Sequence, residues 1–280
     1  MKVRPLTRAV GAEVSEIQLA DAIDRSELAS SIDKLLVEHG VLFFRDQKLS
    51  RDQHVAFGGL FGEVHIHPYA RNLGPEHPEI LEIESDRIDG FLDWHVDATF
   101  ERRPPIVSIL YGRETPPYGG DTLFASAAAA YDALSPVMQQ CLEGLSALHS
   151  SSAVFGRGGS YTVDPASEQT TTHHPVVRAH PSKGRKVLYV NSQFTLCIEG
   201  MHREESDVLL DFLWRHITHP RFQVRFAWTP GSVAMWDNRQ VQHAVVADFA
   251  HTGGRRRMER VAVLETSAAP GTDRRDVMPR

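Results

Sequence analysis

The strongest constraint on the fold is a set of short runs rich in β-branched and aromatic residues, spread unevenly along the chain. In segment 222–228, apolar side chains alternate with polar or small ones, which is typical of a strand with one buried face. Helices of regular length do not separate the runs, and this argues against a doubly wound parallel sheet. We therefore predict a mainly β fold with flanking helices, a sandwich or jelly roll, in one domain over residues 1–280. The expected strands are 41–46, 79–84, 106–112, 186–191, 222–228, 232–236 and 260–265.

Four helices are expected to pack outside these strands. In segment 26–39 the apolar residues recur at helical spacing, and Gly40 can end the helix. Ser50 and Gln53 form a capping-box pattern that opens the second helix. The remaining helical segments are 50–62, 135–144 and 204–217.

Composition excludes several classes of function. The net charge is −6, and the one basic run, Arg255 to Arg257, is too short to indicate nucleic-acid binding. No apolar stretch approaches the roughly 20 residues that span a bilayer, and the first residues do not form a secretory signal. The two cysteines, Cys141 and Cys197, are read as reduced thiols. We therefore expect a cytoplasmic protein that binds neither membrane nor nucleic acid.

Two polar segments resist assignment to helix or strand. Residues 65–93 mix histidine, proline and glycine with short apolar runs, and residues 150–175 are polar and glycine-rich. A loop as long as the second one is usually a binding loop or a lid in a compact domain. We expect 150–175 to close over a site.

His95 and Asp97 lie two residues apart in the segment DWHVDATF. On a strand they would point to the same face, so an imidazole and a carboxylate could bind one ion. A second histidine from a distant strand would complete the facial triad of a non-haem Fe(II) oxygenase. The motif is weak alone, because His-x-acid recurs at His77 and His202 among 15 histidines. A solvated polar pair at a strand edge is the alternative.

The C-terminal region supplies candidate partners for this pair. His243 follows a strong expected strand and is the candidate second histidine. If segment 256–264 is extended, Arg256 and Arg260 share one face of it. Two arginines on one face are costly to bury without anions, and a guanidinium binds a carboxylate in a bidentate manner. The pattern indicates a diacid cosubstrate, an anionic substrate or both, with a surface salt-bridge ladder as the alternative.

Six motifs in order resemble the taurine dioxygenase family of Fe(II)- and 2-oxoglutarate-dependent oxygenases, over nearly the whole chain. The resemblance implies a double-stranded β-helix, or jelly roll, with iron bound by His95, Asp97 and His243. It also implies a homo-oligomer, a dimer or tetramer. The motifs are FGEVHIHP (61–68), WHVDATF (94–100), YGGDTLFAS (118–126), HPVVRAHPSKGRKVLYVN (174–191), WDNRQVQHAVVAD (236–248) and RRRMER (255–260).

The resemblance also assigns a cosubstrate site. Thr122 and Arg256 would hold the distal carboxylate of 2-oxoglutarate, and Trp236 would pack near it. Arg255 and Arg257 remain alternatives to Arg256, because the preceding loop is slightly longer than in relatives. Asp237 is a candidate for orienting one of the metal ligands.

The expected substrate pocket follows from the same resemblance. Arg260 and His67 would grip an anionic head, with Phe155 and Phe194 as lining residues or as plain packing. Phe91 stands where taurine-specific enzymes have asparagine, and an aromatic ring suits an amine poorly. We therefore expect a longer sulfonate, an alkyl sulfate or an aryloxyalkanoate rather than taurine.

The implied reaction is hydroxylation of a carbon atom of this substrate with Fe(II), 2-oxoglutarate and O2, giving succinate and CO2. Two other functions stay open on the residues alone. One is a non-oxidative metal hydrolase, because two histidines and a carboxylate also bind zinc. The other is a non-catalytic binding protein on the same fold, since a fold does not prove activity.

Overall fold

The computed structural model describes residues 1–68, 70–85, 90–91, 93–152, 170–249, 252 and 254–265. Within these ranges the main sheet has eight strands in the order β1-β2-β3-β15-β7-β17-β4, with β5 also paired to β17. All of its pairings are antiparallel except β2 with β3. The strands are β1 (Lys2–Pro5), β2 (Ala12–Ser15), β3 (Val41–Phe44), β4 (Glu63–His65), β5 (Leu81–Ser85), β7 (Val107–Glu114), β15 (Val233–Asp237) and β17 (Arg256–Leu264).

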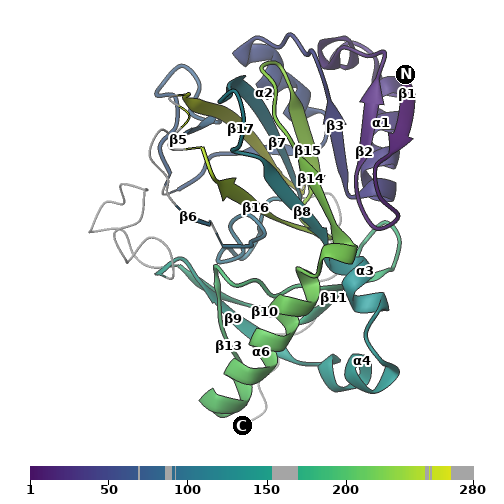
Figure 1. Ribbon diagram of the computed structural model, residues 1–280, viewed down its shortest axis with the longest axis vertical. Helices are drawn as coiled ribbons and strands as arrows, with labels where there is room; N and C mark the ends of the chain where they lie inside the picture. The colour runs from purple at the N-terminus through teal and green to yellow at the C-terminus, as the bar shows by residue number, and fades with distance from the viewer. Residues whose placement is uncertain are drawn as a thin grey trace.

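A second sheet, with four strands in the described chain, follows the order β14-β8-β16-β6. Apolar side chains from both sheets, including Phe43, Phe124 and Met258, form one buried cluster, so the two sheets face each other across it. This is the jelly-roll core, and Figure 1 shows the two sheets in the upper half of the molecule. The strands are β6 (Gly90–Phe91), β8 (Thr122–Ser126), β14 (Gln223–Phe226) and β16 (Val241–Ala247).

Helices cover the outer face of the main sheet. The helix α1 (Ser26–His39) and α2 (Arg51–Gly59) pack with a short 3-10 turn, η1 (Leu19–Ala22), on Phe44, Ile109 and Met235 of that sheet. The helix α1 has the predicted bounds. The capping box of Ser50 and Gln53 is confirmed, with both reciprocal hydrogen bonds present.

A third layer lies at the lower end of the molecule in Figure 1, where α6 crosses beside the strands β9, β10 and β13. These elements enclose a separate apolar core with α3 and α4. The elements are α3 (Ala127–Asp132), α4 (Pro136–Leu142), α6 (Arg203–Ile217), η2 (Pro220–Phe222), β9 (Ser146–Ser150), β10 (Thr171–Pro175), β11 (Val177–Ala179), β12 (Lys186–Leu188) and β13 (Thr195–Ile198).

Several strand predictions differ from the structure in their bounds. The strand β17 begins at Arg256, four residues before the predicted 260, and β12 ends at Leu188 rather than 191. His243 lies within a strand, β16, and does not merely follow one. Segment 171–175 forms β10, whereas most of the expected lid, 153–169, lies outside the described residues. Among the described helices none is long and apolar enough to cross a membrane.

Candidate metal centre and adjoining pocket

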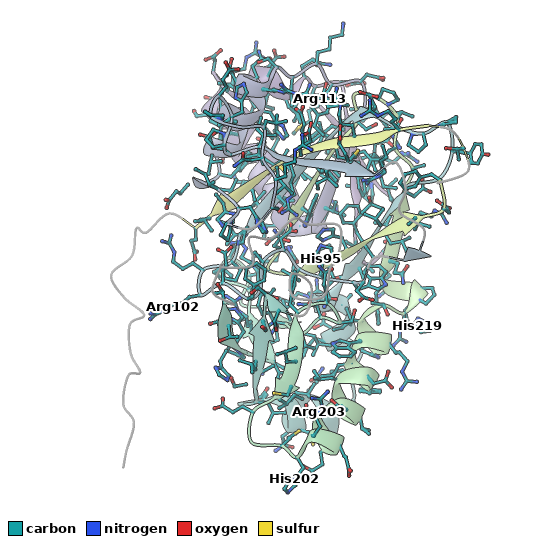
Figure 2. All side chains as sticks on the ribbon, turned by 90° about the vertical axis from the view of Figure 1, so that its left-hand side faces the viewer. His95, Arg102, Arg113, His202, Arg203 and His219 are labelled. Carbon is teal, nitrogen blue, oxygen red and sulfur yellow. The ribbon has the colours of Figure 1, made fainter. Side chains whose placement is uncertain are left out.

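The three expected metal ligands converge on one point. His95 and His243 form an isolated antiparallel bridge, in which each backbone N–H donates to the other residue's carbonyl at 3.0 and 2.9 Å. Asp97 lies two residues along on the same side. The Nε2 atoms of both imidazoles lie 3.8 Å from Asp97 Oδ1, and the three ligand atoms all lie within 4.8 Å of one another. Figure 2 shows His95 near the middle of the molecule.

Neighbouring groups hold the two imidazoles with one nitrogen toward this point. The Nδ1 of His95 lies 2.9 Å from the Asp93 carbonyl oxygen and donates to it in the neutral ring, which leaves the Nε2 lone pair for a metal. The ring of His243 packs between Trp236 and Phe124, at centroid distances of 4.6 and 6.1 Å. The site therefore presents two preoriented nitrogen donors.

Asp97 is 2% exposed and is surrounded by donors. The Ser108 hydroxyl donates to Oδ2 at 2.6 Å, and the Arg260 guanidinium donates to Oδ1 in an ion pair. Burial alone would raise the pKa of Asp97, but the Arg260 charge above all, with smaller effects of the nearby imidazoles and the Ser108 hydroxyl, outweighs it and holds that pKa well below its usual range. The carboxyl group is therefore ionised at neutral pH.

Burial also lowers the pKa of His95 and, more strongly, that of His243, because the charged imidazolium loses solvation. At neutral pH the centre thus holds two neutral imidazoles and one carboxylate. This is the ligand set and protonation state that a non-haem Fe(II) site requires. The residues present fit the metal that the sequence predicts.

Beside this centre, Arg256 and Thr122 lie together as expected. Arg256 is 2% exposed, its Nε donates to the Gly120 carbonyl oxygen at 3.0 Å, and its Nη2 lies 3.5 Å from Thr122 Oγ1. Arg255 and Arg257 instead form outward ion pairs with glutamates, at 3.2 and 3.0 Å. Of the three arginines that the sequence left open, Arg256 is therefore the one that lies against Thr122.

The glycine pair before Thr122 makes room for this arginine. Gly120 has a φ of +67°, and a Cβ placed there would lie 3.1 Å from Arg256 Cδ. Any larger residue would be strained in that left-handed conformation and would crowd the guanidinium stem. The segment YGGDT is thus a turn that lets Arg256 lie against Thr122.

The predicted substrate residues are placed only in part. The ring of Phe194 meets His95 edge-on at a centroid distance of 6.0 Å and Phe100 at 5.2 Å, and His67 lies 6.3 Å from Phe100. His67 and Arg260 both line a narrow cavity between β4 and β5. Phe91 in β6 pairs through its backbone with Val246 in β16, but its side chain, like all of Phe155, lies outside the described residues.

Sequence reasoning assigned a ligand-orienting role to the wrong residue of the segment WDNR. Asp237 accepts hydrogen bonds from His180 at 2.7 Å and from Arg239 at 2.8 Å, and not from any of the three ligands. Its neighbour Asn238 reaches the metal centre, because its Nδ2 donates to Ser108 Oγ at 2.8 Å. The one sequence feature that could have pointed to Ser108 is its hydroxyl in the otherwise apolar run 106–111.

Two imidazoles and one carboxylate that converge inside a jelly roll define the class of non-haem Fe(II) oxygenases. The family model of the taurine catabolism dioxygenase TauD, TfdA family matches residues 2–262, and the chain belongs to that family. It is a 2-oxoglutarate-dependent dioxygenase that uses Fe(II), 2-oxoglutarate and O2.

Individual relatives are similar over most of their length. An alkylsulfatase of Acinetobacter baylyi is 34% identical over all of this chain and 90% of its own length. A crystal structure of a taurine dioxygenase from Burkholderia xenovorans is 37% identical, with a TM-score of 0.81 over 94% of this chain and 90% of that one. A crystal structure of AAD-2 with Mn(II) and N-oxalylglycine is 29% identical, with a TM-score of 0.78 over 95% and 97% of the two chains.

Proposed function

We propose that this dioxygenase holds Fe(II) through His95, Asp97 and His243 and oxidises a carbon atom of a small anionic organic substrate. The observation that carries the proposal is the approach of two Nε2 atoms to one carboxylate oxygen at 3.8 Å in a buried site. With three protein ligands, the remaining positions of an iron ion are available to a keto acid and to oxygen. Fe(II) held by these three residues would supply the redox chemistry that links decarboxylation of 2-oxoglutarate, to succinate and CO2, with oxidation of the substrate carbon by O2.

Arg256 and Thr122 are proposed to bind the far carboxylate of 2-oxoglutarate. A buried guanidinium next to a hydroxyl gives a carboxylate charge-assisted hydrogen bonds from both groups. Met258, which lies on the same face of β17 between the two arginines, is buried and keeps this region apolar.

Arg260 and His67 are proposed to bind the anionic head of the primary substrate. Burial, and after it the nearby Arg260 charge, lowers the pKa of His67 to about 3, so the ring is neutral. Its Nδ1 accepts a hydrogen bond from the Ala70 N–H at 3.0 Å, which places the ring hydrogen on Nε2. One cation and one neutral donor suit a sulfate ester, sulfonate or carboxylate carrying a single charge.

The apolar part of the substrate is proposed to lie against Phe100 and Phe194. These rings pack edge to face beside His95, and both are at least 96% buried. Aromatic walls exclude water from the reacting carbon, which protects a reactive oxidant from solvent. The names of two similar proteins, an alkylsulfatase and a taurine dioxygenase, support sulfur oxyanions as the head group.

Further properties stay predictions. A cytoplasmic location is supported by Cys141 and Cys197, both described and both free thiols. A dimer or tetramer rests on analogy alone, and the single domain over 1–280 stays a prediction from the residue pattern. The prediction that segment 150–175 closes over the site concerns mainly residues 153–169, which lie outside the described residues.

Succinate release tests the proposed function. The purified enzyme would receive Fe(II), 2-oxoglutarate and O2 with an alkyl sulfate, an alkanesulfonate, an aryloxyalkanoate or taurine, and succinate would be measured against a no-substrate blank. We expect stimulation by at least one of the first three and less by taurine. Stimulation by taurine alone would contradict the expectation that an amine-bearing substrate is disfavoured.

Asp97→Ala should reduce this stimulated release to the blank, because the metal loses its one anionic protein ligand. Asp132→Ala is the matched control, since Asp132 is an exposed carboxylate that pairs with Arg185 far from the site. Turnover by Asp97→Ala at the level of the control would rule out the proposed ligand set.

A further inference from the structure

A buried hydroxyl links the metal-binding carboxylate to the loop after β15. Ser108 on β7 and Asn238 are 0% and 1% exposed, and Trp236 is fully buried beside them. Trp236 lies directly opposite Ser108 in the register of β15 and β7. The hydrogen bonds run from Trp236 Nε1 to Asn238 Oδ1 (2.9 Å), from Asn238 Nδ2 to Ser108 Oγ (2.8 Å) and from Ser108 Oγ to Asp97 Oδ2 (2.6 Å).

The direction of this chain follows from its first donor. An indole N–H can only donate, so the atom of Asn238 that faces Trp236 must be the carbonyl oxygen. The backbone N–H of Asp97 points at the same oxygen, at 3.4 Å. The amide NH2 of Asn238 therefore faces Ser108, and it can only donate there. Since the Ser108 oxygen accepts from Asn238, its own hydrogen is directed to Asp97.

The result is a distinction between the two oxygens of Asp97. Oδ2 accepts a hydrogen bond from the neutral Ser108 hydroxyl, whereas Oδ1 accepts from the Arg260 guanidinium. Oδ1 is the oxygen that lies 3.8 Å from both histidine Nε2 atoms. We propose that Ser108 and Asn238 are positioning residues, which hold Oδ2 away from the metal and present Oδ1 as a single, fixed ligand. This inference rests on the proposed ligand set of His95, Asp97 and His243.

The proposal explains why a serine stands in an apolar strand. Ser108 is flanked by Trp236 on β15 and by Ala262 on β17, and its neighbours Val107 and Ile109 point to the opposite, apolar core. An alanine would fill the same place in the core at lower desolvation cost. Hydrogen-bond partners behind metal ligands typically change metal affinity by about 10–100-fold when they are removed. A carboxylate free to rotate would present either oxygen or both.

Metal affinity without turnover tests this role. Mn(II) would be titrated into the metal-free protein by calorimetry, without cosubstrate or oxygen chemistry. We expect Ser108→Ala to raise the Kd for Mn(II) by about tenfold or more. Asn238→Ala should also raise it, and Asn238→Ala added to Ser108→Ala should change it by less than about twofold, because Asn238 is proposed to act on Oδ2 of Asp97 through the Ser108 hydroxyl.

Ser232→Ala is the matched control. Ser232 is also fully buried, but its hydroxyl contacts Arg45 and Thr229 rather than the metal site. It should lower the thermal midpoint of the metal-free protein while leaving the Kd for Mn(II) within about twofold. Should Ser108→Ala not fold, Ser108→Cys keeps the side-chain size with a weaker donor and should show the same direction of change.

If folded Ser108→Ala or folded Ser108→Cys bound Mn(II) with an unchanged Kd, the Ser108 hydroxyl would have only a packing role. That result would overturn the proposal. That failure differs from failure of the proposed ligand set. In the second case Asp97→Ala would also bind Mn(II) as tightly as the unaltered protein.

Discussion

At the scale of single residues, the site depends on which atom each side chain presents. His95 offers its Nε2 lone pair because its Nδ1 hydrogen is donated to the Asp93 carbonyl oxygen, whereas the Ala70 N–H donates to Nδ1 of His67 and so fixes the opposite tautomer there. Ala98, directly after the carboxylate ligand, has a φ of +47°, a conformation that costs a non-glycine residue about 1–3 kcal/mol. The surrounding contacts hold this strained turn, which directs the chain away from the strand after Asp97.

The three adjacent arginines allow a sharp prediction at this scale. Arg256→Ala should raise the KM for 2-oxoglutarate by about 30-fold or more, because truncating a buried partner of a charged pair costs about 2 kcal/mol or more. Arg255→Ala and Arg257→Ala should leave it within about threefold, since these residues pair with outward glutamates. Succinate formation at varied 2-oxoglutarate measures all three. A larger effect from Arg255→Ala or Arg257→Ala than from Arg256→Ala would reassign the cosubstrate residue.

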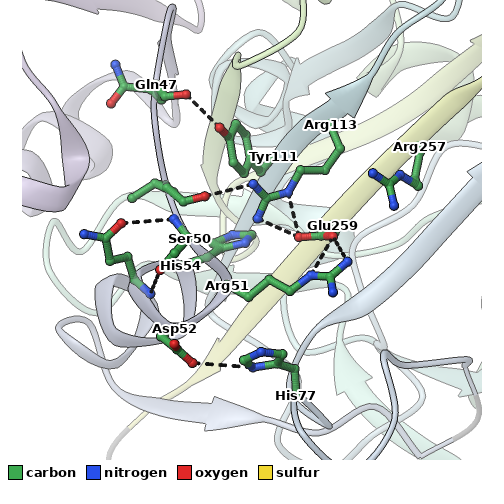
Figure 3. Close-up of polar contacts among 12 residues, drawn as sticks. Gln47, Ser50, Arg51, Asp52, His54, His77, Tyr111, Arg113, Arg257 and Glu259 are labelled. Atoms are coloured by element: carbon green, nitrogen blue, oxygen red, sulfur yellow. Dashed lines mark hydrogen bonds and ion pairs between the residues drawn. The ribbon is translucent and has the colours of Figure 1, made fainter.

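At the scale of elements, an ion triad joins α2 to the outer face of β17. Glu259 is fully buried, and it accepts hydrogen bonds from Arg51 at 2.8 Å and from Arg113 at 2.7 Å, as Figure 3 shows. Because residues alternate along β17, Glu259 points away from the barrel while Arg256 and Arg260 point into it. The triad therefore anchors the strand that carries both proposed anion-binding arginines.

Removing the centre of this triad should be strongly destabilising. Glu259→Ala leaves Arg113 largely buried without its carboxylate, and we expect a loss of about 3–5 kcal/mol in the free energy of unfolding. Arg51→Ala should cost clearly less, because Arg51 is 40% exposed and Glu259 retains Arg113. Urea unfolding followed by circular dichroism compares the two. If Glu259→Ala and Arg51→Ala lowered the free energy of unfolding equally, the triad would not depend on the buried carboxylate.

Elements with strong local signals were predicted well from sequence. The helix α1 was predicted with its observed bounds from helical periodicity and a terminal glycine, and α2 from its capping box. Short strands such as β9 and β10 were missed, because Ser146–Ser150 and Thr171–Pro175 are mostly polar and their strand structure depends on pairing, of β9 with both β10 and β13. Local pattern cannot show such pairing.

The same limit applies to the metal site. Its three ligands were predicted from residue types together with family resemblance, and the structure brings them together. The link from Asn238 through Ser108 to Asp97 was not predictable, because it depends on the cross-strand register that sets Trp236 opposite Ser108. Register is a property of the folded sheet and not of any one segment.

At the scale of the whole molecule, buried neutral histidines tie stability to pH. Burial, the largest cause in each case, lowers the pKa of His54 and His174 to about 4 and that of His67 and His149 to about 3. The unfolded chain binds protons at these positions below pH 6.5, whereas the folded chain does not. The folded state is therefore favoured above pH 6.5 and loses stability as the pH falls toward 4.

Each of these histidines can reduce the free energy of unfolding by at most roughly 1.4 kcal/mol per pH unit in this window. We expect the urea midpoint of the metal-free protein, kept in chelator, to fall clearly between pH 7 and pH 5. His54→Gln should make the fall less steep, because one such group is removed. A midpoint that is constant or rises over this range would contradict the prediction.

The long strand β17 has a consequence for how this enzyme can change its specificity. Arg256 and Arg260 stand four residues apart on one rigid strand, a span of about 13 Å. Inserting one residue between them would turn one guanidinium outward, and inserting two would lengthen the span by about 7 Å. The distance between the carboxylate bound by Arg256 and the anionic head bound by Arg260 is therefore fixed by the strand between them. An enzyme with both arginines on one strand can therefore accept shorter or longer substrates only through changes in the pocket residues that lie outside β17.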